Sequence, residues 1–449
     1  MASRRYSEHL RQTTLRPTSI SRWLTSSTAL PAQIVKAHGD DETAEDAQPP
    51  QAQPPLPPLP LKAHFMYGTL LWTMFLSGWN DGTPGPLIPR IQEVYHIGFI
   101  VVSLIFVFNF LGFVTAAALN VWLTDKYGLG KVMVVGAVCQ IVGYCLAAPA
   151  PPFPVFVLAH LFNGLGISLQ LSGSNSFVSS YRQNVSTRLA LLHSIYGAGA
   201  LAAPLVATQF SQMTHWSFHY LISLAMAVVN ITLLAAVFRL KTHDECLREI
   251  GITPATDGAT DEVTTSKYKQ MMKLPIVHQL ALFILIYVGT EVTLGGWIVT
   301  YVIDLRGGGP SSGYISSGFF GGLMAGRILL LGVNKLRSVM RAYRLELVVW
   351  LVPSLVGGAV AVAFVGMLLG PMYPLVVNHA RQVLPPWLLS GSIGWIAGFG
   401  QAGSAFLPFV TGALASKVGI KVLQPVIVSM MGVMVTVWVF VPHAPRRLE

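Results

Sequence analysis

The sequence predicts an all-α, polytopic membrane protein whose twelve helices form two six-helix halves. First, long apolar stretches fill nearly everything after residue 60, and a helix of about 20 apolar residues crosses a bilayer core about 30 Å thick. Second, only 11% of the residues are charged, whereas ~25% is usual in a soluble domain. Third, one segment of the first half resembles the segment at the same place in the second half.

Residues 1–62 form a polar tail that we expect to be disordered and cytosolic. An acidic stretch runs from Asp40 to Asp46, and prolines crowd the stretch from Pro49 to Pro60. This composition cannot bury enough apolar surface to fold, and the prolines make it a stiff spacer. The first thirty residues are rich in Arg, Ser and Thr, a composition also typical of mitochondrial transit segments, so that alternative stays open.

Residues 63–239 make up the expected first half. Its six spans lie at residues 64–87, 97–119, 132–148, 153–178, 189–210 and 218–238. A hydrophilic linker at 240–275 follows and carries both signs of charge, which predicts a cytosolic connection.

Residues 276–441 make up the expected second half, and a short tail at 442–449 follows it. Its spans lie at residues 277–303, 312–333, 342–352, 354–377, 387–413 and 422–441. The third of these is weak, because three arginines on one helical face precede only about eleven apolar-leaning residues, too few for an ordinary crossing. We keep it as a crossing because the chain then has six spans in each half; without it, everything after it would invert.

The distribution of basic residues predicts the orientation. With twelve spans and both termini in the cytosol, 24 of the 29 Lys and Arg residues lie on the cytosolic side. Loops with an excess of Lys and Arg stay cytosolic. The net charge of +10 therefore reflects membrane topology, and it does not predict a nucleic-acid partner, which would require basic residues clustered on one face.

An internal repeat relates the two halves. The fifth span contains YGAGALAAPLV from Tyr196, and the eleventh contains FGQAGSAFLPFV from Phe399. With one inserted residue, these pairs align: Tyr196 with Phe399, Gly197 with Gly400, Gly199 with Gly403 and Pro204 with Pro408. Two halves related in this parallel way are typical of transporters whose substrate site lies between the halves near the middle of the membrane.

Two motifs make the chain resemble the major facilitator superfamily (MFS) of transporters. The connection NVWLTDKYGLGK from Asn120 to Lys131 is similar to the cytosolic signature of that family, although Asn120 stands where a glycine is usual. The resemblance implies that Asp125 and Lys131 lock helices together during conformational change. Within the family, GWNDGTPGPLIP from Gly78 resembles the fucose-permease-like branch and its fungal relatives.

Two departures from that branch bear on function. In the branch an acid precedes an asparagine of the fourth span by four residues, whereas Leu171 stands four residues before Asn175 here. The alignment therefore removes one carboxylate that the branch links to protons. The short ninth span is the second departure, and a deletion or a gene-model error would explain it.

Ionisable residues inside spans are expensive and usually functional. Asp81 lies in the first span beside Asn80, among glycines and prolines that loosen the helix, and we expect it to carry the coupling proton. Glu291, in the seventh span, is its counterpart, and an ion pair with Arg327 is the alternative. Arg327, in the eighth span, is expected either to act in conformational change or to reach the cytosolic interface with its long side chain.

Polar residues of the spans are the candidate solute ligands. They are Asn80, Asn163, Gln170, Asn175, His193 and Gln401, although hydrogen bonds between helices are the common use of such residues. Trp297 follows Glu291 in the seventh span, and an aromatic ring stacks on the apolar face of a sugar while carboxylate oxygens accept its hydroxyls.

These residues predict a secondary transporter that carries a sugar or a similar solute with protons by alternating access. A drug or organic-solute exporter, and a non-transporting sensor or degenerate paralogue, are the alternatives. No catalytic residues, metal ligands or cofactor motif emerge from the sequence, and the three cysteines lack a metal-ligand spacing. We expect a monomer in the plasma membrane, with a vacuolar or mitochondrial membrane as the alternatives.

Overall fold

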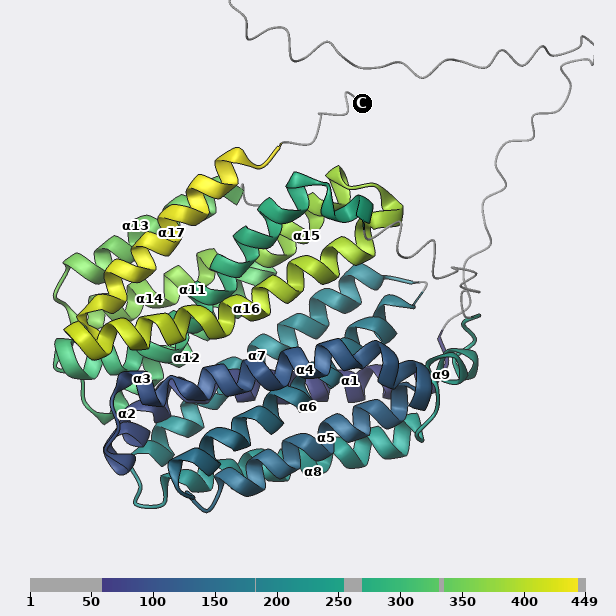
Figure 1. Cartoon of the computed structure of the whole chain (residues 1–449), viewed down its shortest axis with the longest axis horizontal. Coiled ribbons are helices and arrows are strands. Elements are labelled where there is room, and N and C mark those ends of the chain that lie inside the picture. Colours follow the sequence, from purple (N-terminus) through teal and green to yellow (C-terminus); the bar gives the residue numbers. More distant parts are fainter. Residues whose placement is uncertain (1–58, 182, 254–268, 331–334, 443–449) are drawn as a thin grey trace, which may run out of the picture. The chain divides into compact units, whose positions relative to one another are not determined.

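The computed structural model describes residues 59–181, 183–253, 269–330 and 335–442. The expected tail at 1–62, apart from its last four residues, and nearly all of the expected tail at 442–449 lie outside them. All regular elements of the described part are helical (Figure 1). The all-α prediction is therefore confirmed.

Helices stand at each of the six spans predicted in the first half. They are α1 (Leu61–Gly82) with α2 (Pro84–Tyr95), α3 (Phe99–Val102) with α4 (Leu104–Tyr127), α5 (Leu129–Ala147), α6 (Phe153–Ser179), α7 (Val185–Ser211) and α8 (His219–Phe238). A short helix, α9 (His243–Glu249), follows α8 within the expected linker.

Helices also stand at the six spans predicted in the second half. They are α11 (Pro275–Arg306), α12 (Tyr314–Leu329), α13 (Lys335–Leu351), α14 (Leu355–Leu369) with α15 (Met372–Val383), α16 (Pro386–Val418) and α17 (Leu423–Phe440). The tenth span is thus two helices, which separate at Gly370 and Pro371.

The first span breaks between α1 and α2 at Thr83. Pro84 has no backbone N–H and cannot bond to the carbonyl of Asn80, and the N–H of Thr83 donates to that oxygen instead, at 3.4 Å. The Thr83 hydroxyl donates to the Trp79 carbonyl at 2.8 Å and lies 3.0 Å from His219 Nε2. The break lies two residues after Asp81, in the segment where the glycines and prolines predict a loosened helix.

The helices of the second half pack in the same pattern as those of the first. Helix α1 packs against α7, as α11 packs against α16, and α4 packs against α6, as α12 packs against α14. Helix α13 contacts α14 and α17, as α5 contacts α6 and α8. The weak ninth span therefore occupies the place that α5 has in the first half (Figure 1).

Helix α13 is longer than the sequence predicted. It begins at Lys335 rather than near residue 342 and has 17 residues, about 25 Å of helix at a rise of ~1.5 Å per residue. The stretch rich in arginine is part of the helix, because Arg, Lys, Leu and Met are good helix formers whatever their polarity. The predicted start near residue 342 is therefore corrected to Lys335, although α13 is not among the described helical stretches that are long and apolar enough to cross a membrane.

The aligned glycines of the repeat make the same kind of contact in each half. A Cβ on Gly199 of α7 would lie 2.0 Å from the carbonyl oxygen of Phe75 in α1, and a Cβ on Gly403 of α16 would lie 2.0 Å from the carbonyl oxygen of Leu285 in α11. Small residues let membrane helices approach backbone to backbone. Since α1 carries Asp81 and α11 carries Glu291, these contacts fix the helices of both candidate carboxylates.

Length and hydropathy identify a membrane protein. Among the described residues, nine helical stretches are long and apolar enough to cross a membrane. Helices α1, α12 and α13 are not among them, although each stands at a predicted span. Large apolar side chains such as Leu111, Val356 and Phe406 are exposed, as expected where lipid replaces water.

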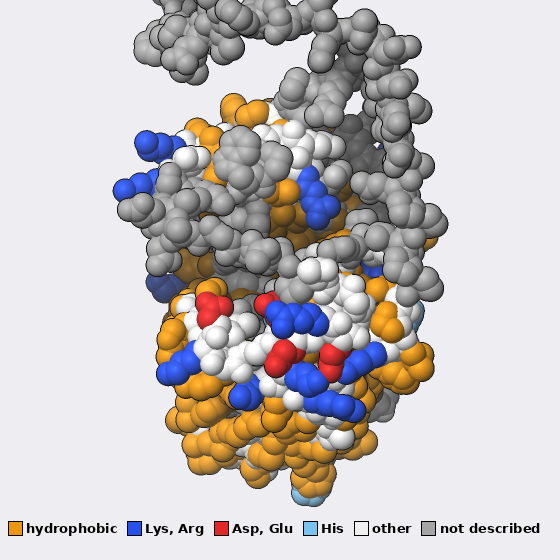
Figure 2. Space-filling view, turned by 90° about the vertical axis from the view of Figure 1, so that its right-hand side faces the viewer, with side chains coloured by type: hydrophobic (Ala, Val, Ile, Leu, Met, Phe, Trp, Pro, Cys, Tyr) orange, Lys and Arg blue, Asp and Glu red, His pale blue; other side chains and the backbone are white. Residues whose placement is uncertain are grey.

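Charged side chains gather at the end of the molecule that carries α9 (Figure 2). Glu249 of α9 accepts from Lys62 at the start of α1, at 2.5 Å, and from Lys241 after α8. Hydrogen bonds from these two lysines, that from Lys241 being the stronger influence, hold the pKa of Glu249 below its ordinary value. The N–H of Gly130, at the start of α5, donates to the Lys241 carbonyl at 2.8 Å. Glu249 of α9 and the segment before α9 thus tie together the ends of α1, α5 and α8.

Candidate functional site

A group of polar side chains joins the two halves. We call it the central polar cluster and define it as Asp81, Tyr196, Glu291 and Arg327. Asp81 and Tyr196 belong to α1 and α7 of the first half, while Glu291 and Arg327 belong to α11 and α12 of the second half. The cluster brings together the three ionisable span residues that the sequence singled out, and it adds a tyrosine.

Asp81 is bound by Tyr196. The Tyr196 hydroxyl donates to Asp81 Oδ2 at 2.5 Å, a short distance typical of a hydrogen bond to a charged acceptor. The contact follows from helix packing, because a Cβ on Gly78 would lie 1.8 Å from the backbone oxygen of Tyr196. The glycine thus lets α1 approach α7 closely enough for the side chains to meet.

Glu291 and Arg327 form an ion pair. Arg327 Nη2 lies 3.4 Å from Glu291 Oε1, and only 11% and 9% of these side chains are exposed. The Arg327 guanidinium also lies over the Tyr196 ring, 5.8 Å from its centroid, within the range of a cation–π interaction. Tyr196 therefore touches a carboxylate of one half and a cation of the other.

Further polar and aromatic residues border the cluster. Tyr144 of α5 donates to Asn80 Oδ1 at 3.4 Å, next to Asp81. The His193 ring of α7 lies 6.5 Å from the Tyr373 ring of α15, and both interact electrostatically with Arg327. The Tyr287 side chain lies beside the Glu291–Arg327 pair. Asn80 and His193, two of the predicted ligands, therefore border the site.

Gln170 belongs to a different hydrogen-bond chain. Its Nε2 donates to the Met133 carbonyl at 3.4 Å, and its Oε1 accepts from Asn230 at 3.2 Å. Asn230 Oδ1 in turn accepts from the Thr73 hydroxyl at 2.8 Å. Gln170 is fully buried, so the chain links α5, α6, α8 and α1 within the first half, which is the structural use of such residues.

The other two predicted ligands of the fourth span also make local contacts. Asn175 donates to the carbonyl of Leu171 at 3.0 Å, one helical turn earlier. Asn163 is buried at the contact of α6 with α5, where its Oδ1 would lie 2.5 Å from a Cβ on Gly143. That oxygen has no hydrogen-bond partner among the described residues.

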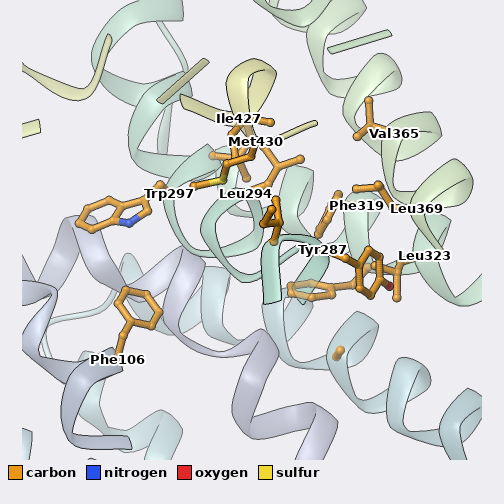
Figure 3. Close-up of a cluster of buried hydrophobic side chains, with 14 of the residues drawn as sticks. Phe106, Tyr287, Leu294, Trp297, Phe319, Leu323, Val365, Leu369, Ile427 and Met430 are labelled. Carbon is orange, nitrogen blue, oxygen red and sulfur yellow. The ribbon is translucent and has the colours of Figure 1, made fainter. Parts of the chain in front are cut away.

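Trp297 does not lie with Glu291. Its indole N–H donates to the Pro408 carbonyl of α16 at 3.1 Å, and its ring packs against Phe99 and Phe106. Figure 3 shows Trp297 facing Phe106, away from Tyr287. Six residues along a helix place two side chains about 120° apart around its axis, so the sugar-binding pair of Glu291 and Trp297 is not formed in this conformation.

The remaining predicted residues lie away from the cluster. Gln401 is half-buried on α16, in the stretch where Gly400 and Gly403 pack on α11. Asp125 and Lys131 are exposed on either side of the α4–α5 turn, close to the segment that Gly130 binds. Their predicted roles are not decided by these contacts.

Sequence reasoning did not identify Tyr196 as a site residue. The sequence placed Tyr196 only in the internal repeat, where it aligns with Phe399. The tyrosines that belong to a site cannot be identified from sequence alone, because the role of each depends on which helix it faces.

Within the described ranges, no group of three or more His, Cys, Asp or Glu side chains is placed to hold a metal.

Comparison with known families matches the Major Facilitator Superfamily to residues 70–361, more than half of the chain. A Saccharomyces cerevisiae protein, "Bypass of stop codon protein 6", is 26% identical over 396 residues, which cover 81% of this chain and 80% of the yeast protein. A protein of Brucella abortus named a glucose/galactose transporter is 25% identical over 394 residues, covering 80% of this chain and 90% of its own length.

A solved structure shares the fold. The E. coli fucose:proton symporter superposes with a TM-score of 0.58 at 15% sequence identity, and the match covers 84% of this chain and 98% of the symporter. At that identity the likeness concerns the fold, and it extends over both six-helix halves.

Proposed function

This chain belongs to the Major Facilitator Superfamily, and on that premise we propose that it carries a sugar or a similar polyhydroxylated solute together with protons by alternating access. Its membership makes it an integral membrane transporter and not an enzyme. We further propose that residues 63–239 and 276–441 are the halves that move, joined by the linker at 240–275.

The central polar cluster is the observation that carries this proposal. It lies where α1 and α7 of one half meet α11 and α12 of the other, and it contains two carboxyl groups and one guanidinium. Substrate sites of such transporters lie between the halves near the middle of the membrane. A solute bound there would contact both halves, so its contacts would change when the halves separate.

The charges of the cluster support a role for protons. Arg327 compensates one carboxylate, and it is already paired with Glu291. A second carboxylate, on Asp81, would leave one negative charge in excess, and uncompensated charge inside a membrane is expensive. One proton on Asp81 would balance the cluster, so Asp81 is the group that we propose to load and release the coupling proton.

The chemistry of the cluster also supports a neutral polar solute. Asn80, Tyr144, His193 and Tyr373 supply donors and acceptors beside the charged residues, and sugar hydroxyls can both donate and accept. The Brucella relative is named for glucose and galactose, and the E. coli structure is that of a fucose:proton symporter. We propose a monomer in the plasma membrane with both termini in the cytosol, in accord with the positive-inside distribution.

Uptake into proteoliposomes with an imposed pH gradient tests the proposal. The panel is D-glucose, D-galactose, L-fucose, D-xylose and a cationic dye, with the wild type beside Asp81→Asn. We expect sugar uptake that depends on the gradient in the wild type, and loss of that dependence in Asp81→Asn, because an amide cannot carry the proton. Movement of the dye without sugar would indicate an exporter, and folded protein that moves none of the solutes would contradict transport of this class.

A further inference from the structure

On the premise of the proton-coupled transport proposed above, we infer that Tyr196 is the positioning residue that makes separation of the two halves depend on the proton at Asp81. Tyr196 is the member of the central polar cluster that touches the coupling carboxyl of the first half and the cation of the second half at the same time.

Tyr196 is held firmly by the first half. Its backbone is in contact with α1, because the Cβ positions of Gly78 and Gly199 would lie 1.8 Å and 2.0 Å from backbone oxygens across the α1–α7 contact. Its hydroxyl donates to Asp81 at 2.5 Å. Tyr196 therefore moves with α1 and α7 as one unit when the halves rearrange.

The ring of Tyr196 meets the second half. Arg327 of α12 lies over it at 5.8 Å, and α7 packs against α12 at the next residue, where a Cβ on Gly197 would lie 3.1 Å from the Cβ of Met324. Arg327 is fixed in turn by Glu291. The cation–π contact must break if α7 and α12 separate.

The strength of that contact depends on the charge of Asp81. An ionised carboxylate polarises the hydroxyl that donates to it, and hydrogen bonds in a chain polarise one another. The added electron density on the ring strengthens its attraction for a cation. When a proton from solution binds Asp81, the acceptor becomes neutral, the ring loses that polarisation, and the hold of the first half on Arg327 weakens.

Several polar and charged groups surround Asp81 and Arg327. Asp81 interacts with Tyr196 of α7, Glu291 of α11 and Tyr144 of α5. Arg327 interacts with a larger set, which consists of Glu291, Tyr287, Tyr196, His193 and Tyr373. Tyr196 and Glu291 belong to both sets. Of these two, Tyr196 is the one that hydrogen-bonds to Asp81 and also lies against Arg327, so it provides the direct link between proton and cation.

Cross-linking across the α7–α12 contact tests the inference without any solute. Cys139, Cys145 and Cys246 are first replaced by serine or alanine, and Gly197→Cys is combined with Met324→Cys. A Cβ at position 197 would lie 3.1 Å from the Cβ of residue 324, slightly closer than the ~3.5–4.5 Å of a disulfide, so a small separation of α7 from α12 brings the two cysteines to bonding distance. Disulfide formation is then timed at acidic and at neutral pH.

Comparison between backgrounds removes the pH dependence of the thiols themselves. With Asp81 and Tyr196 intact, acid should slow cross-linking more than it does in Asp81→Asn, because protonation releases the contact. Tyr196→Phe keeps the ring but loses the hydroxyl, and its response to acid should fall to that of Asp81→Asn. Tyr95→Phe, which removes a hydroxyl that donates to the Pro151 carbonyl far from the cluster, should respond as the intact protein does. A Tyr196→Phe protein with the intact response would overturn the inference.

Transport provides an independent second measurement. In proteoliposomes, the ratio of gradient-driven D-galactose accumulation to D-galactose exchange should fall in Tyr196→Phe relative to the wild type, whatever the change in exchange itself. A ratio at the wild-type level would overturn the coupling role of Tyr196 and leave the proposed function standing. If no sugar moves in the wild type but cross-linking responds as described, the solute class is wrong and the coupling inference stands.

Discussion

Arg327 and Glu291 depend on each other in a part of the molecule that offers little water. Both side chains are about nine-tenths buried and lie 3.4 Å apart. Breaking a buried ion pair by removing one partner is strongly destabilising, because it leaves an uncompensated charge. The same pair borders the proposed transport site, so stability and function can be separated by comparing single and double variants.

Glu291→Gln should lower the free energy of unfolding by about 3 kcal/mol, because the Arg327 guanidinium loses its counter-ion. The double variant Glu291→Gln with Arg327→Gln should recover most of that loss, because two amides can bond to each other. Thermal unfolding in detergent measures both. Equal stability of the single variant and the wild type would contradict an ion pair that compensates the buried charge.

The roles of charged residues in the spans could be predicted from the sequence, whereas those of uncharged polar and aromatic residues could not. Asp81, Glu291 and Arg327 could be singled out from the sequence because charge inside a membrane is expensive wherever the side chain points. Gln170 and Trp297 could not be assigned, since one bonds to Asn230 and Met133 and the other packs against Phe99 and Phe106. Their roles depend on the neighbouring helix, which a single sequence does not specify.

Close contacts between helix backbones position the elements of the site. Gly199 is in contact with α1 and Gly403 with α11, and the two glycines align in the internal repeat. The repeat in the sequence thus corresponds to a repeated close contact between helices, one on the helix of Asp81 and one on the helix of Glu291. The packing pattern also explains how α13, short and basic at its start, takes the place that α5 has in the first half.

Gly199→Ala should destabilise the protein by about 2 kcal/mol, because an added methyl group in a well-packed contact must displace its neighbours. It should also impair transport, since Asp81 is carried by the displaced helix. Gly432→Ala is the matched control, because a Cβ on Gly432 of α17 meets nothing within 4 Å and alanine favours a helix. Thermal unfolding that is equal for the two variants would contradict the close α1–α7 contact.

For the whole molecule, the topology rests on α13. If this helix crosses the membrane, the chain after it has the orientation that the distribution of Lys and Arg predicts; if it does not, α14 to α17 are inverted. Arg381 and Lys421 are both exposed; Arg381 lies in α15, just before α16, and Lys421 lies just after α16. Whether a reagent outside the cell reaches these two positions therefore shows whether α13 crosses the membrane.

A cysteine-free protein that carries Lys421→Cys should react with an impermeant maleimide in intact cells, as expected for an outer loop. Arg381→Cys, and Arg248→Cys on α9, should react only after the membrane is permeabilised. The reverse pattern for positions 381 and 421, with Arg248→Cys still protected, would mean that α13 does not cross. Labelling of Arg248→Cys in intact cells would contradict the cytosolic placement of α9.

The amino-acid sequence alone was enough to predict a helical membrane protein of two related halves and its superfamily, because apolar length, charge placement and local motifs are properties of the chain. It also predicted that Asp81, Glu291 and Arg327 lie within spans. The contacts that join Tyr196 to Asp81 and Arg327, and the separate contacts of Gln170, Asn175 and Trp297, required the folded structure. A helical pattern shows which side chains share a face but not which helix that face meets.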